Sequence, residues 1–74
     1  MNMEKSKLSG WLKRARMAKG LSQIELAKEL GLTNQTLMNI ETGKHTPSIK
    51  SMKKIADYFE KPLAELYAML WENL

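Results

Sequence analysis

SQIELAKELGLTNQTLMNIETG, residues 22–43, carries the pattern of two short helices joined by a tight turn. Ser22 and Glu25 are spaced as a capping box, in which each side chain satisfies a free backbone N–H at the start of a helix. Gly31 ends this helix, because glycine adopts the left-handed conformation of a helix C-terminus without steric cost. Thr33 follows as the predicted N-cap of the next helix, which Gly43 closes.

The second helix of this pair presents small uncharged amides and hydroxyls on one face. Asparagine and glutamine carry a donor and an acceptor side by side, which matches the N6 and N7 edge of adenine in the major groove. The layout is typical of a DNA-reading helix-turn-helix, whose second helix enters the major groove with its N-terminal residues leading. We predict five base-reading residues on this face: Thr33, Asn34, Gln35, Thr36 and Asn39.

Three more helices are predicted around the pair, and they hold it, because isolated helices shorter than about 12–15 residues are marginal. The first spans about residues 7–19, with apolar residues at helical spacing at Leu8, Trp11, Leu12 and Ala15. Ser48 caps a fourth helix, whose expected buried stripe is Ile49, Met52, Ile55, Ala56 and Phe59. Pro62 suits the first position of a fifth helix. The fold class is therefore all-α, a five-helix domain over residues 7–74, and we expect residues 1–6 to be disordered.

Charge is distributed unevenly along the chain, whose formal net charge is +4. Basic residues crowd residues 1–19 and 44–54, whereas acidic residues dominate residues 57–74. This distribution favours a basic surface that meets a polyanion and an acidic end that points away from it. A solvated lysine-rich surface would produce the same charge pattern.

Several function classes are excluded by what the sequence lacks. The chain has no cysteine and a single histidine, so no metal site or cofactor is expected. It shows no paired carboxylates, no nucleophile with an obvious base and no glycine-rich phosphate loop, so we predict that it is not an enzyme. No apolar run approaches the ~18 residues of a membrane span, and the N-terminus lacks the apolar segment of a signal peptide. We therefore expect a cytoplasmic protein without a membrane partner.

A series of small, apolar and polar residues in one register gives a more specific indication. These are Arg16…Gly20-Leu21-Ser22-Gln23…Glu25-Leu26-Ala27…Leu30-Gly31, then Thr33…Leu37…Ile40-Glu41…Gly43-Lys44…Pro47-Ser48. In this register, about residues 12–67 resemble the Cro/repressor (Xre) family of lambda-repressor-like DNA-binding domains. The resemblance implies a five-helix fold, operator binding to double-stranded DNA, commonly as a dimer, and transcriptional regulation. We expect the regulator to be a repressor, and a protein of this kind is expected to be bacterial or phage-encoded and nucleoid-associated.

The resemblance also assigns roles to residues outside the reading helix. Gln23 matches a glutamine that usually contacts a DNA phosphate, and Lys44 and His45 match a loop that usually lies along the DNA backbone. Arg16 and Glu41 match a partly buried structural ion pair. Ser22 is also predicted to contact a phosphate, because it lies at a helix N-terminus, where free N–H groups favour a phosphate oxygen.

The C-terminal helix has more apolar residues than a small core can use. A broad apolar face on a terminal helix indicates a partner surface, and dimers that read two half-sites are the natural use. We predict a homodimer interface formed by Leu66, Met69, Leu70, Trp71 and Leu74. Alternatively, Trp71 and Leu74 fold back over the core of the monomer. The rival function is a protein-interaction module, such as an antitoxin or anti-repressor partner, that uses this same helix.

Overall fold

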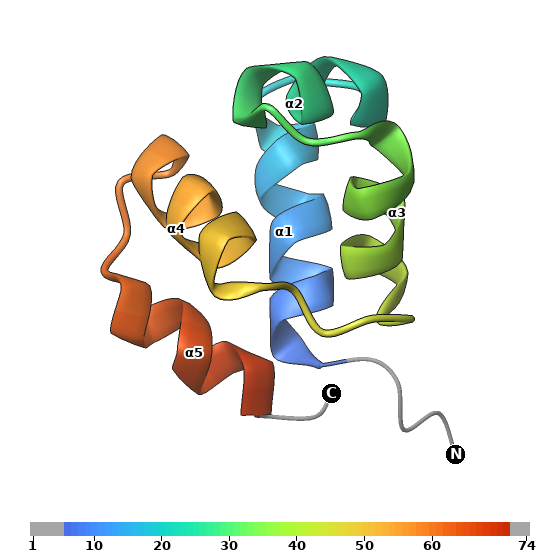
Figure 1. Cartoon of the computed structure of the whole chain (residues 1–74). Helices are drawn as coiled ribbons and strands as arrows, with labels where there is room; N and C mark the ends of the chain where they lie inside the picture. The colour runs from blue at the N-terminus through green and yellow to red at the C-terminus, as the bar shows by residue number, and fades with distance from the viewer. Residues whose placement is uncertain (1–5, 72–74) are drawn as a thin grey trace.

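Five helices make up the computed structural model, which describes residues 6–71 of the chain (Figure 1). Their bounds are α1 Lys7–Ala18, α2 Gln23–Leu30, α3 Asn34–Thr42, α4 Ile49–Tyr58 and α5 Leu63–Trp71. No strand occurs within residues 6–71, so the predicted all-α five-helix fold is confirmed. α1 runs through the middle of the molecule and packs against α3 on one side and α5 on the other.

Side-chain caps start three of the helices, as their sequences predict. Ser22, Thr33 and Ser48 each accept a hydrogen bond from the backbone N–H three residues later, at 3.0–3.1 Å. At α2 the capping box is complete, because the backbone N–H of Ser22 also donates to Glu25 Oε1 at 2.8 Å. The backbone N–H of Ser22 and, to a lesser extent, its side-chain hydroxyl lower the pKa of the Glu25 carboxyl from its ordinary value. A cap of this kind contributes about 1 kcal/mol to the stability of a short helix.

Each of the helices α1 to α4 is followed by a left-handed residue at which the chain reverses. Gly31 has φ +69° between α2 and α3, and the N–H of Leu32 reaches back to the carbonyl of Ala27 at 2.8 Å. This closing bond is that of a Schellman motif. Glu60 holds the equivalent position after α4 with φ +55°, a conformation that is strained for a residue with a Cβ.

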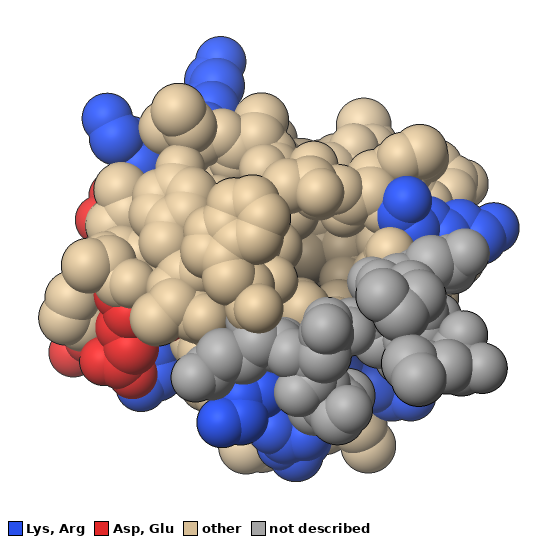
Figure 2. Space-filling model, turned by 90° about the horizontal axis from the view of Figure 1, so that it is seen from below, with Lys and Arg blue, Asp and Glu red and all other residues tan. Residues whose placement is uncertain are grey.

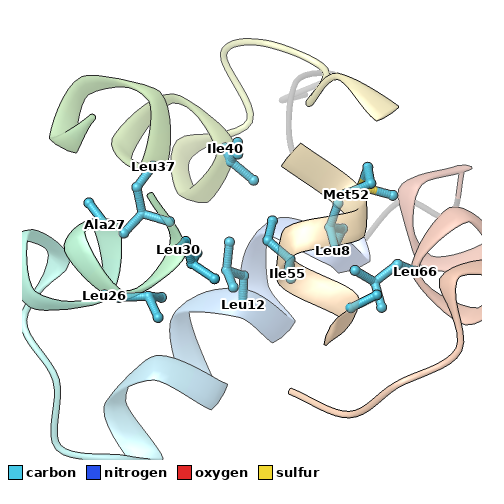
Figure 3. Packing of buried hydrophobic residues seen from close by; sticks show 11 residues of the cluster. Leu8, Leu12, Leu26, Ala27, Leu30, Leu37, Ile40, Met52, Ile55 and Leu66 are labelled. Carbon is cyan, nitrogen blue, oxygen red and sulfur yellow. The ribbon is translucent and has the colours of Figure 1, made fainter. Parts of the chain in front are cut away.

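The core is one cluster to which all five helices contribute (Figure 3). Around Leu12 of α1, buried side chains from α2, α3, α4 and α5 point toward one another. The buried apolar residues are Leu8, Leu12, Leu26, Ala27, Leu30, Leu37, Ile40, Met52, Ile55, Ala56 and Leu66. A buried bond from Ser9 Oγ to the carbonyl of Ile40, at 2.9 Å, adds a polar tie between α1 and α3.

The expected stripe of α4 is wrong at its first residue. Ile49 is 64% exposed, whereas Met52, Ile55 and Ala56 are buried. Because Cα–Cβ bonds tilt toward a helix N-terminus, the first residue of α4 points away from the core. Phe59 is half-buried and packs edge-on against Trp11, with 5.3 Å between ring centroids.

The segment predicted to be disordered, residues 1–6, lies outside the described residues except for Ser6. Ser6 is buried and occupies the N-cap position of α1. The expectation for residues 1–5 stays a prediction.

Candidate nucleic-acid interface

The predicted reading residues lie on α3 and at its start, along one edge of the molecule (Figure 1). Thr33, Asn34 and Gln35 are exposed, whereas Thr36 and Asn39 are half-buried. Gln35 Nε2 donates to Asn39 Oδ1 at 3.0 Å, so these two amides form one hydrogen-bonded pair on the helix surface. The pair leaves an acceptor on Gln35 and a donor on Asn39 available to a base edge.

Thr33 is engaged in the structure of the helix itself. Its hydroxyl accepts from the backbone N–H of Thr36 at 3.0 Å and lies 2.8 Å from the Thr36 hydroxyl. A base contact by Thr33 would have to be compatible with this cap. Asn34 and Gln35 do not cap the helix, so they are the clearest candidates for base contacts at the N-terminus of α3.

The predicted ion pair is present and links α1 to the end of α3. Arg16 Nε lies 2.8 Å from Glu41 Oε2, and a second guanidinium nitrogen lies 3.3 Å from Glu41 Oε1. The side chains are 11% and 2% exposed, respectively. The third guanidinium nitrogen donates to the carbonyl of Leu21 at 2.7 Å, immediately before α2. Arg16 therefore fixes the start of α2 and the end of α3 at once.

Gln23 lies beside this ion pair, a contact that the sequence did not reveal. Its Nε2 donates to Glu41 Oε1 at 3.0 Å, across 18 positions of sequence. Ser22, the other phosphate candidate on α2, is exposed and holds the capping box.

A groove of about 450 Å³ separates α3 from the loop that follows it. Thr33, Thr36 and Asn39 line one side, and His45 lies with the loop residues on the other. The loop lining also includes Thr46, Pro47 and Ser48, which sequence reasoning left out of the interface although they directly follow Lys44 and His45. Lys44 and His45 are both exposed. The structure thus brings Thr33, Thr36 and Asn39 to the same groove as His45. Asn34, Gln35 and Lys44 are not among the residues that line it.

The predicted dimer face on α5 divides into buried and exposed residues. Leu66 is fully buried in the core of the monomer, so its assignment to a partner surface is wrong. It fills the space between α1 and α4, and a helix of this length must use one stripe for its own core. Met69 and Leu70 are half-buried, and Trp71 is 78% exposed. Leu74 lies outside the described residues.

Seen from below, the described surface of the molecule includes one broad uncharged area (Figure 2). Acidic side chains gather at one edge of this view, and basic side chains lie at other edges. Within the described part of the chain, no three His, Cys, Asp or Glu side chains are grouped to hold a metal ion. None of the described helices is both long and apolar enough to span a membrane.

A family model described as Helix-turn-helix matches residues 12–66. The chain belongs to the helix-turn-helix family. It is a DNA-binding transcriptional regulator of the Cro/repressor type, as the resemblance implied. The matched span begins within α1 and ends within α5, so it contains the reading helix, the ion pair and the following loop.

Relatives of this family member occur in archaea and in phages. An HTH-type transcriptional regulator of Methanocaldococcus jannaschii is 41% identical over 56 residues, which cover 76% of this chain and 85% of the relative. The ImmF control region 10 kDa protein of Bacillus phage phi105 is 39% identical over 54 residues, or 73% of this chain and 60% of that protein. The transcriptional repressor RstR of the cryptic phage CTXphi, from Vibrio cholerae, is 31% identical over 69% of this chain and 46% of its own length.

Solved structures share the fold. Bacillus thuringiensis PlcR, crystallised with the peptide PapR7 and DNA, matches with a TM-score of 0.78 and 27% identity. The match covers 90% of this chain and 24% of the PlcR chain. ClgR of C. glutamicum, described as a clp gene regulator, superposes with a TM-score of 0.71 at 18% identity over 95% of this chain and 91% of that chain. The likeness to ClgR bears on fold alone.

Proposed function

We propose that this protein is a repressor that binds an operator in double-stranded DNA with α3 in the major groove. The observation that carries the proposal is the exposed amide face of α3, where Asn34 leads and Gln35 and Asn39 form a hydrogen-bonded pair. Amides of this kind match adenine edges, so A·T base pairs are expected within each half-site. Relatives named as a repressor and as a phage control-region protein support the repressor role. Binding rather than catalysis is the proposed activity, in a cytoplasmic regulator.

The phosphate contacts are proposed on both sides of the reading helix. Ser22 and Gln23 stand at the start of α2, and Lys44 and His45 follow α3 in an exposed loop. Contacts on both flanks fix the register of a helix in the groove without adding sequence information. Of these four residues, Lys44 brings a full positive charge, so its contact should be visible in the salt dependence of binding.

A homodimer is the proposed form on DNA. The support is Trp71, which is 78% exposed, whereas Met69 and Leu70 on the same helix are half-buried and pack against the monomer core. A twofold pair that uses this face would read two half-sites about one helical turn apart. The operator is then an inverted repeat.

The test is selection of binding sites from a random pool of double-stranded DNA with the purified protein at about physiological salt. Enrichment of a short inverted repeat is expected, and its spacing measures the distance between the two reading helices. The Asn34→Ala/Gln35→Ala variant is the matched control, because both residues are exposed and their loss leaves the core intact. Weak, salt-sensitive retention without any enriched sequence would contradict the proposal and favour a protein-interaction role.

The enriched site then allows the loop contact to be tested. Neutralising one phosphate contact lowers the slope of log affinity against log salt by about 0.9. Lys44→Gln should therefore flatten the slope by about that amount, with base preference unchanged. An unchanged slope would remove Lys44 from the interface.

A further inference from the structure

Glu41 makes a second contact that its role in an ion pair does not require. Its carboxylate receives Arg16 and also receives Gln23 Nε2, at 3.0 Å. Glu41 is 6% exposed, whereas Gln23 is half-buried at the surface. The three side chains come from α3, α1 and α2, so the contact joins all three helices at the start of α2.

The chemistry of the two groups fixes which way the Gln23 amide faces. A carboxylate only accepts hydrogen bonds, so the amide nitrogen, and not the amide oxygen, must face Glu41. A DNA phosphate also only accepts. The second hydrogen on the same Gln23 nitrogen can therefore be donated to the phosphate. A flipped amide would instead turn its oxygen toward the phosphate, and two acceptors cannot form a hydrogen bond.

Arg16 makes this arrangement compatible with DNA. An unpaired carboxylate beside the phosphate backbone would repel it, but the Arg16 guanidinium lies against both Glu41 oxygens and neutralises the pair. Arg16 also holds the carbonyl of Leu21, directly before the capping residue of α2. Glu41 thereby orients the amide of Gln23, and Arg16 holds the chain in place at the start of α2.

We propose that Glu41 is a positioning residue for DNA binding, which holds the Gln23 amide with its N–H toward a phosphate. The inference rests on the proposed function, since it concerns the proposed phosphate contact of Gln23. It also connects that contact to α3, because Glu41 lies two residues after Asn39 in the reading helix. The phosphate contact of Gln23 and the base contacts of α3 then both depend on the position of α3.

A double-mutant cycle on affinity for the selected operator tests the inference. Gln23→Ala should weaken binding about tenfold, as expected for one hydrogen bond to a charged group. The salt slope should not change, because Gln23 carries no charge. Glu41→Gln should weaken binding about fivefold in the wild-type background and less than about twofold in the Gln23→Ala background.

Additive losses would overturn the proposal, because a purely structural Glu41 would matter equally with or without the Gln23 amide. Gln35→Ala is the matched control, because it removes another exposed amide that pairs with Asn39 and not with Glu41. Its loss should add to that of Glu41→Gln. If the wild-type protein selects no operator at all, it is the proposed function that fails.

Glu41→Gln removes half of a buried ion pair, so thermal unfolding must be followed alongside binding. If that variant does not fold, Glu41→Asp takes its place, because it keeps the charge for Arg16 but withdraws the carboxylate by one methylene. An independent test measures by NMR the hydrogen-exchange rates of the two Gln23 side-chain amide hydrogens in the wild-type protein without DNA. One of the two hydrogens should exchange more slowly than in free glutamine, and equal rates would also overturn the proposal.

Discussion

Several polar residues at the interface hold the structure together as well as facing the proposed DNA. Thr33 caps α3 while standing at the leading end of the reading helix, and Ser22 caps α2 beside a proposed phosphate contact. Substituting either residue therefore changes stability and binding together. Asn34 and Gln35 are better probes of recognition, since they are exposed and neither serves as a cap.

Asn34→Ala and Gln35→Ala are each expected to relax base preference while leaving the fold intact. Each bidentate amide–adenine pair contributes ~1–3 kcal/mol of discrimination against the wrong base. The loss should appear at separate positions of the operator for the two variants. Fluorescence anisotropy against a panel of single-base operator variants measures it, with thermal unfolding as the check on folding. An unchanged preference profile in both variants would remove these residues from the reading face.

Because Glu25 takes part in the capping box of α2, the free energy of unfolding is expected to depend on pH. The pKa of Glu25 is lowered by the bonds with the backbone and side chain of Ser22, so the ionised form stabilises the folded state. That contribution is fully present above the ordinary pKa that the glutamate has in the unfolded chain, and it is lost as the pH falls through the lower folded pKa.

Thermal unfolding of the wild type and Glu25→Gln between about pH 7 and pH 3 measures this effect. The wild type should lose more stability on acidification than the variant. Ser22→Ala is the companion variant, because removing the partner hydroxyl should also reduce the pH dependence that Glu25 adds. Parallel curves for all three proteins would contradict the role of the capping box.

At the level of the helices, the geometry of the turns matters as much as the helices themselves. α2 and α3 have only 8 and 9 residues, so neither is stable without its caps and its packing. The turn between them depends on Gly31, whose φ of +69° is the left-handed conformation. The angle between α2 and α3 follows from that turn.

Gly31→Ala should destabilise the protein by ~1–2 kcal/mol, the cost of a left-handed alanine. A Cβ at this position would meet Lys54 Nζ at 3.5 Å, an ordinary contact, so backbone strain is the expected cause. Gly20→Ala is a matched control, with φ +72° and open space around the Cβ. Urea unfolding should show similar losses for both variants. DNA affinity, measured where both are folded, should fall more for Gly31→Ala, and equal affinities would contradict the role of this turn in aligning α3.

For the whole molecule, the main question is how α5 divides its apolar residues between the core and a partner. Leu66 packs inside the monomer, while Trp71 is 78% exposed. One stripe of α5 therefore serves the fold, and the proposed dimer depends on the exposed Trp71. Substitutions at these two positions should separate the two uses.

Leu66→Ala should lower monomer stability by about 2–5 kcal/mol, because it leaves a cavity in a small core. Trp71→Ala should leave monomer stability within about 0.5 kcal/mol but weaken self-association. Light scattering over a concentration series measures the mass, and chemical unfolding at low concentration measures the stability. A wild type that stays monomeric at high micromolar concentration, free and on its operator, would contradict the proposed dimer.

Much of this structure is predictable because it depends on local interactions. Caps at Ser22, Thr33 and Ser48 and the left-handed glycines act within one or two helical turns, so spacing alone indicates where the helices begin and end. Periodicity likewise identifies buried positions of α1 and α4, because a helix repeats about every 3.6 residues. These positions are Leu8, Leu12, Met52, Ile55 and Ala56. Periodicity fails at Ile49, where the stripe continues in sequence but the first residue of α4 is exposed.

The sequence was sufficient for the fold class, the helix-turn-helix and the family register, since these follow from short-range pattern. Tertiary structure alone decided that Leu66 belongs to the core and that Trp71 faces outward, because burial depends on which neighbouring helices cover a face. It alone brought Gln23 to Glu41, 18 positions away, on the carboxylate that Arg16 already holds. Contacts between helices depend on how the helices pack, and no spacing within a single helix encodes them.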